Sequence, residues 1–105
     1  MNIFVLDTNP KIAAQMSCDK HVVKMVSESV QMLSTTMHSV GLEGPWKKTH
    51  ANHPCTIWTR ESDEHYMWLF DHMVALGKEY TKRYGKTHLS ITKCFLPLYR
   101  IPVGI

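Results

Sequence analysis

The hydrophobic positions of the chain predict two long helices. The first apolar stripe recurs at steps of three and four and ends at Gly41; it consists of Val22, Val26, Val30, Leu33, Met37 and Val40. The second follows Ser62, a candidate N-cap, and ends at Gly85; it consists of Leu69, Met73, Leu76, Tyr80 and Tyr84. This spacing places the side chains of each stripe on one helix face, so we expect two long helices packed together.

Shorter elements are expected around this pair. Residues 2–6 are predicted to form a short N-terminal strand or an extended arm that packs Ile3 and Val5 on the core. Asn9 followed by Pro10 is typical of a helix start, because Asn caps well and Pro fits the first helical position.

Prolines and glycines mark the remaining segments. His53-Pro54 is expected to open a helical turn, whereas residues 41–52 read as a loop. Residues 97–105 contain two prolines and are expected to form an irregular tail. The predicted fold is therefore a mostly α, single helical domain over residues 1–105.

Composition narrows the class of protein. The chain has 105 residues, 44% of them apolar, which fits one globular domain. No apolar run reaches the roughly 18 residues that span a bilayer, and the start lacks a signal peptide's basic flank. The three cysteines are expected to be reduced, which favours a cytoplasmic location. The formal charge of +3 fits a phosphate-bearing partner but is also common in other domains.

One polar row lies beside the first apolar stripe. His21, Lys24 and Glu28 follow one another at steps of three and four, so a helix places them on one face, with Asp19 and Lys20 just before them. A histidine, a lysine and a carboxylate at the edge of a core suit acid–base chemistry or phosphate binding. The alternative is a solvated face with a Lys24–Glu28 ion pair.

A second polar cluster surrounds the predicted start of the next helix. Its members are Lys47, Lys48, His50, His53, Arg60, Glu61, Glu64 and His65. A helix start favours an anion, and Trp46 and Trp58 are candidates for stacking on a nucleic-acid base. For Trp58 we favour the simpler interpretation that it belongs to the core.

The cysteines and histidines also suggest a metal. Cys18-x-x-His21 and His50-x-x-His53-x-Cys55 provide five potential zinc ligands in two short motifs. The second motif does not have a standard zinc-knuckle spacing. We therefore predict no metal and no cofactor, and keep a zinc-stabilised interaction module as an alternative.

Several motifs resemble those of small bacteriophage proteins of poorly defined function. The similarity runs to about His88 and is carried by Phe4-Val5-Leu6-Asp7, Ala13-Ala14-Gln15, the stretch from Cys18 to Met25, Gln31-x-Leu33-Ser34-Thr35, Asn52-His53-Pro54-Cys55 and the stretch from Tyr80 to Lys86. Those proteins are in turn distantly similar to the phage pyrimidine-dimer DNA glycosylases of the endonuclease V type.

The glycosylase resemblance implies roles for two residues. In those enzymes an Asp-x-His is followed, seven residues after the His, by the catalytic Glu; here Asp19-Lys20-His21 is followed by Glu28 at that spacing. It implies that Glu28 assists opening of the sugar ring and that His21 positions it. The glycosylases attack the sugar carbon with their N-terminal amine, which removal of Met exposes. This chain differs, because Met1 is expected to remain before Asn2. It also carries Ser27 and Gln31 where the enzymes have arginines.

These observations support three hypotheses. The favoured one is a phage-type, non-catalytic protein that binds a nucleotide or nucleotide-derived molecule in a polar pocket, for example to sequester a host immune nucleotide signal in the host cytoplasm. The ligand-binding residues would be Lys20, His21, Lys24, Glu28, His53 and Arg60. The alternatives are a DNA glycosylase/lyase acting on damaged pyrimidines, and the zinc module. DNA and a second copy of the chain are the other expected partners, and a membrane is not.

Overall fold

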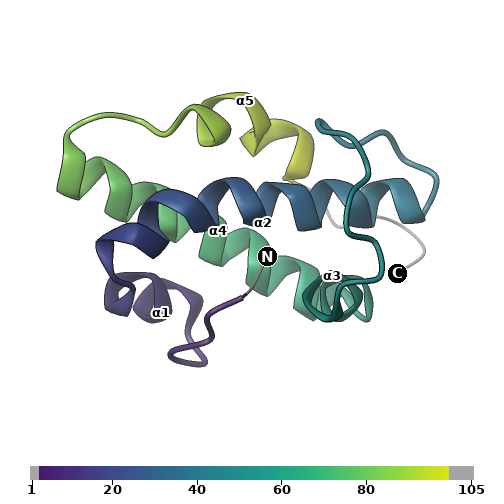
Figure 1. Ribbon diagram of the computed structural model, residues 1–105, viewed down its shortest axis with the longest axis horizontal. Helices are drawn as coiled ribbons and strands as arrows, with labels where there is room; N and C mark the ends of the chain where they lie inside the picture. The colour runs from purple at the N-terminus through teal and green to yellow at the C-terminus, as the bar shows by residue number, and fades with distance from the viewer. Residues whose placement is uncertain (1–2, 100–105) are drawn as a thin grey trace.

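Two long helices pack against each other at the centre of the computed structural model, as the hydrophobic pattern predicts (Figure 1). The model describes residues 3–99, apart from the side chain of Leu96, and over that range it contains no strand. The helices are α1 (Pro10–Met16), α2 (Asp19–Ser39), α3 (Pro54–Arg60), α4 (Asp63–Tyr84) and α5 (Leu89–Leu98). None of these helices is long and apolar enough to cross a bilayer.

The core lies between α2 and α4. It contains most of the predicted residues of both stripes, with Val22, Val26, Val30, Leu33, Met37, Leu69, Met73 and Leu76 all buried. Val40 and Tyr80 are half-buried. Tyr84 is 45% exposed, because the last turn of α4 extends beyond the helices that cover the core. Tyr66 is also buried, and its hydroxyl donates to the carbonyl of Leu98 at 3.0 Å. This bond connects α4 with the end of α5.

Local sequence signals determine where three of the helices begin or end. The side chain of Asn9 accepts hydrogen bonds from the first turn of α1, and the Ser62 hydroxyl accepts one from the backbone N–H of His65 at 3.1 Å. Gly85 ends α4 with a left-handed φ of 72°. All three predictions are confirmed. In α2 the capping position is Cys18, and Asp19 is the first helical residue.

Removing the Ser62 cap gives a direct test of this helix start. We expect Ser62→Ala to lower the free energy of unfolding by about 1 kcal/mol, because the N–H of His65 loses its acceptor. Urea denaturation measures the change. Ser39→Ala, at the C-terminal end of α2, is the comparison. An equal effect of both substitutions on the free energy of unfolding would contradict a specific capping role for Ser62.

The predicted N-terminal strand is absent from the described residues. The arm alternative is correct for Ile3, which packs on the core, but the expected packing of Val5 is wrong. Ile3 and Phe4 are half-buried against the core, whereas Val5 is 54% exposed. The reason is that a strand needs a neighbour for its backbone hydrogen bonds, and residues 3–99 contain no other strand that could pair with it. The arm is therefore held by side-chain packing.

The C-terminal part forms a helix that the mixed sequence pattern did not indicate. Cys94 and Leu98 lie four residues apart and are buried, which gives α5 its apolar contact with the core. The helix passes through Pro97 to Leu98, two residues into the expected irregular tail. The rest of that tail, from residue 100, lies outside the described residues.

His72 is a buried histidine of α4 whose protonation couples stability to pH. Its side chain is 2% exposed, and its Nδ1–H donates to the carbonyl of Pro10 at 3.0 Å. Burial lowers the pKa of His72 below its ordinary value of 6.5, and the bond to Pro10 only partly opposes this. The unfolded chain therefore takes up this proton more readily than the folded one.

This lowered pKa predicts a loss of stability in mild acid. The contribution of neutral His72 is fully present above pH 6.5 and is lost as pH falls through the lower pKa of the folded state. Urea denaturation between pH 7.5 and pH 5 should show a decline that is smaller in His72→Asn than in the wild type. Equal declines in the two proteins would assign the effect to other groups.

Candidate functional site

A polar row follows one side of α2, next to the core positions of that helix. His21 and Glu28 are half-buried, whereas Lys20 and Lys24 are exposed. The helix brings His21, Lys24 and Glu28 onto one face, because steps of three and four residues return to the same side. The row thus places two lysines in solvent and a carboxylate at the edge of the core.

The N-terminal arm covers one end of this row. The ring of Phe4 stacks on the imidazole of His21, with 4.0 Å between ring centroids and an interplanar angle of 11°. On its other side the arm borders α3, where an apolar hollow of about 280 Å³ is lined by Ile3, Val5, Pro54, Cys55 and Trp58. The arm therefore lies between the α2 row and the start of α3.

His53 and Arg60 lie at the two ends of α3. The Nδ1 atom of His53 accepts a hydrogen bond from the backbone N–H of Cys55 at 3.1 Å, so its proton is on Nε2. The guanidinium of Arg60 donates to the carbonyl of Ala51. Seven residues of helix separate the two side chains by about 10 Å along the axis. Both side chains are thus hydrogen-bonded to the backbone, and the bond from Arg60 holds the turn before α3 against this helix.

The loop between α2 and α3 is held on α2 by buried hydroxyl groups. Ser34 donates to the carbonyl of Trp46 at 2.7 Å and accepts from its N–H at 3.0 Å. Thr35 makes the same pair of bonds with Thr49, at 2.9 and 3.0 Å. These bonds position the loop that leads to His53. No sequence pattern indicated these bonds, because Ser34 and Thr35 lie beside the apolar stripe of α2 and are not part of it.

The other residues of the second polar cluster do not gather into one site. The imidazole of His50 is hydrogen-bonded to the hydroxyl of its neighbour Thr49 at 2.8 Å. The imidazole of His65 is hydrogen-bonded to the carbonyl of Trp58, also at 2.8 Å. The ring of His65 also stacks on Trp58, at 4.1 Å. Trp46 and Trp58 pack against the hydrophobic core, which agrees with the core interpretation of Trp58.

The potential zinc ligands are likewise not brought together. Between residues 3 and 99, no three His, Cys, Asp or Glu side chains form a group with metal-binding geometry. Cys18 is exposed at the start of α2 and Cys55 is half-buried in α3. The described part of the chain therefore offers no support for the zinc module.

An arginine network holds the start of α2 in place. Arg83, near the end of α4, forms ion pairs with Asp19 at 3.0 Å and with Glu79 at 3.1 Å. It also donates to the carbonyls of Ser17 at 2.9 Å and Gln15 at 3.2 Å, which fixes the junction between α1 and α2. Asp19 thus anchors the helix that carries the polar row. No sequence signal predicts this pairing, because Asp19 and Arg83 are 64 residues apart.

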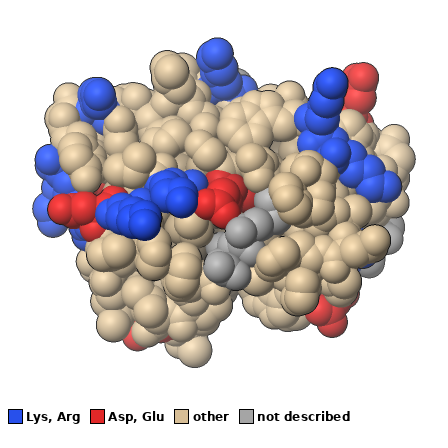
Figure 2. All heavy atoms as spheres, in the orientation of Figure 1, with Lys and Arg blue, Asp and Glu red and all other residues tan. Residues whose placement is uncertain are grey.

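Two exposed lysines lie on the first half of α2. Figure 2 shows a short row of basic side chains on this face, with acidic side chains next to it. The exposed residues Lys20 and Lys24 belong to that half of the helix. Two exposed lysines one helical turn apart are groups that a phosphate-bearing ligand can contact.

Comparison with known proteins identifies the family. A family model described as pyrimidine dimer DNA glycosylase matches residues 1–92. No curated protein and no solved structure matches the chain. The match covers most of the sequence, including the whole polar row of α2 and all of α3 and α4, and it confirms the resemblance noted in the sequence. The chain belongs to the pyrimidine dimer DNA glycosylase family.

Proposed function

We propose that this protein is a DNA repair glycosylase with lyase activity, acting on damaged pyrimidines. The observation that carries the proposal is the polar row of His21, Lys24 and Glu28 on α2, in a chain that belongs to a glycosylase family. The row combines a half-buried carboxylate with exposed lysines, which is the chemistry that cleavage at a sugar in DNA requires. DNA is accordingly the proposed partner.

The proposed reaction begins with an amine of the protein. The amine attacks C1′ of the damaged nucleotide; a nitrogen–carbon bond forms, and the bond from C1′ to the base breaks with its electron pair leaving on the base. Opening of the sugar ring then breaks the bond between C1′ and O4′ and yields a Schiff base. Glu28 would deliver a proton to O4′ in this step, and removal of a proton from C2′ would then release the 3′ phosphate.

His21 is proposed to position Glu28 and the sugar. Its imidazole is fixed by the stacked ring of Phe4, so it has little freedom to turn. It lies two helical turns before Glu28 on the same face of α2. A fixed donor at that distance can orient a sugar or phosphate group between the two side chains.

Lys20 and Lys24 are proposed to contact phosphates of the DNA backbone. The arginines of the glycosylases are replaced here by Ser27 and Gln31. The Ser27 hydroxyl lies 3.2 Å from that of Ser90, so this half-buried position faces α5. Positive charge on this helix is instead provided at its start, where both lysines are exposed.

Binding of a nucleotide signal by the same residues stays a prediction that no finding favours. That hypothesis needs His53 and Arg60 to converge on the α2 row. Both side chains are engaged by backbone groups at opposite ends of α3. Family membership supports the glycosylase instead.

The activity is tested with a duplex that carries a single cyclobutane thymine dimer. The expected result is incision at the dimer and none in the matched undamaged duplex, measured by gel electrophoresis of the labelled strand. Failure to cut the damaged duplex under conditions where the protein binds it would overturn the enzymatic proposal.

The two lysines predict a salt-dependent contribution to DNA binding. We expect Lys20→Gln/Lys24→Gln to weaken duplex binding by about tenfold or more and to reduce the salt dependence of the binding constant. Fluorescence anisotropy across a salt series measures both quantities. Lys93→Gln, an exposed lysine on α5, is the matched control and should leave both nearly unchanged. An equal effect of the control would mean that the contacts are not specific to α2.

A further inference from the structure

A second hollow lies between α1, α4 and α5, away from the α2 row. It has a volume of about 320 Å³. The part of α4 that lines it carries Asp71, Val74, Ala75 and Lys78. Leu69, Met73 and Leu76 are the core positions of the same helix. Successive helical residues turn by 100°, which places the two sets on opposite sides of α4. The core side faces α2, so the groove and the polar row of α2 are separate surfaces.

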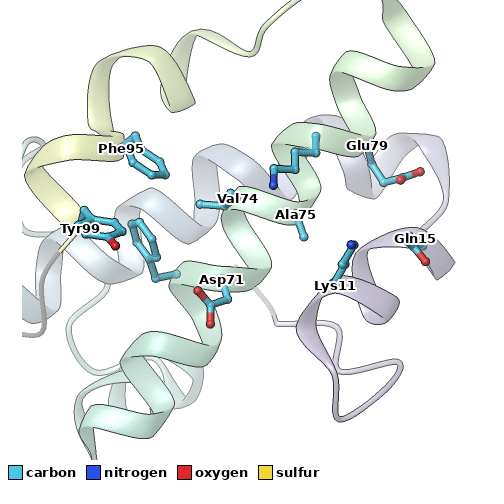
Figure 3. A pocket seen from close by; sticks show the side chains of 10 residues that line it. Lys11, Gln15, Asp71, Val74, Ala75, Glu79, Phe95 and Tyr99 are labelled. Atoms are coloured by element: carbon cyan, nitrogen blue, oxygen red, sulfur yellow. The ribbon is translucent and has the colours of Figure 1, made fainter.

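One wall of the groove is aromatic. Phe70, Phe95 and Tyr99 contact one another, with ring centroids 5.5 to 5.6 Å apart in all three pairs. Tyr99 is 62% exposed, so the cluster offers a ring to solvent rather than ending in a closed core (Figure 3). An exposed ring supported by two others is a surface on which a planar base can stack.

The opposite wall carries two cations. Lys11 of α1 and Lys78 of α4 are both exposed and line the groove. Figure 3 shows Lys11 on the α1 side. Neither side chain forms an ion pair with any residue between 3 and 99. Glu79, which also lines the groove, is paired with Arg83 at 3.1 Å. Its charge is therefore already compensated, and the two lysines are available to an anion.

Asp71 is the second acidic residue that lines the groove. Its carboxylate lies between the aromatic wall and the lysines along α4, and it is exposed (Figure 3). A carboxylate accepts hydrogen bonds, so it suits the amino group of a base. The two lysines and Asp71 together leave a net charge of about +1 at this surface, which favours a ligand with one or two negative charges.

We propose that this groove binds a nucleoside monophosphate unit. The base would stack on Tyr99 and Phe95, its amino group would meet Asp71, and the phosphate would lie on Lys11 and Lys78. The volume of about 320 Å³ is at the lower end of the roughly 300–1,000 Å³ usual for small-molecule sites. The ligand is either a free nucleotide or one nucleotide of a single strand, and both present the same chemistry. This site is independent of the proposed glycosylase activity.

Titration of the full chain with dAMP, followed by backbone amide NMR shifts, tests the proposal. We expect shifts in residues 71–78, and calorimetry should give binding that weakens at least about tenfold in Lys11→Gln/Lys78→Gln. Lys48→Gln, an exposed loop lysine outside the groove, is the matched control and should bind within about twofold of the wild type.

Further probes separate the two walls and the two ligand sources. Tyr99→Ala should weaken binding of dAMP and deoxyadenosine but not of inorganic phosphate, because only the first two contain a base to stack. A short single-stranded oligo(dA) that displaces dAMP at lower concentration assigns the site to a nucleic-acid strand; weaker competition assigns it to a free nucleotide. Absence of dAMP binding at millimolar concentration, or shifts confined to α2, would overturn the proposal.

Discussion

Glu28→Gln is expected to slow incision of dimer-containing DNA by at least about 100-fold. The substitution keeps the size of the side chain but removes the group that would supply a proton to O4′ during opening of the sugar ring. Glu28 is half-buried on α2, next to the exposed lysines proposed to hold the DNA backbone. DNA binding should therefore persist while the chemical step is lost.

Single-turnover incision with enzyme in excess measures this step without product release. Glu43→Gln changes an exposed carboxylate in the loop after α2, and it should incise at the wild-type rate. A circular dichroism melt of each variant checks that the helical fold is retained. A Glu28→Gln enzyme with wild-type single-turnover rates would remove Glu28 from the reaction.

Arg83→Met is expected to produce the largest loss of stability, about 3 kcal/mol in the free energy of unfolding. The side chain of Glu79 is only 11% exposed, and Arg83 is the cation within 3.1 Å of its carboxylate. The substitution leaves that carboxylate poorly solvated and removes the donor from the carbonyls of Gln15 and Ser17. The pair with Asp19 adds less, because that carboxylate is 74% exposed.

A double-mutant cycle separates these contributions. Replacing Glu79 by Gln in the Arg83→Met background removes the unpaired charge, and it should recover more than about 1 kcal/mol. Lys82→Met alters the neighbouring exposed residue and should change stability by less than about 0.5 kcal/mol. Urea denaturation measures the wild type, the Arg83→Met and Glu79→Gln single variants, the double variant and Lys82→Met. Equal stability of Arg83→Met and Lys82→Met would show that the network does not anchor the junction between α1 and α2.

The two long helices were predictable because their signals are local. The apolar stripe of α2 and the Ser62 and Gly85 ends of α4 depend on residues within a few turns of one another. The N-terminal arm was harder, because strand and arm have the same alternating pattern until the presence or absence of a pairing neighbour is known. Helix α5 was missed because its sequence pattern is mixed. Its last two residues were assigned to the irregular tail because Pro97 is a helix breaker in most contexts, yet this proline lies near the end of the helix.

The candidate site was likewise predictable only where its signals are local in the sequence. Spacing alone places His21, Lys24 and Glu28 on one helix face. Spacing cannot show that Phe4 stacks on His21 or that Arg83 holds Asp19, since these contacts join distant parts of the chain. The sequence also suggested that His53 and Arg60 would join the row. Their backbone hydrogen bonds depend on the path of the preceding loop, which buried Ser34 and Thr35 determine.

Borohydride trapping on dimer-containing DNA tests the central claim most directly, because hydride converts only a Schiff base into a permanent protein–DNA link. We predict a covalent adduct that forms with the damaged duplex, requires borohydride and is strongly reduced in Glu28→Gln. Peptide mapping of the adduct would then identify the attacking amine. A protein that binds the damaged duplex but gives no adduct would contradict the glycosylase/lyase account.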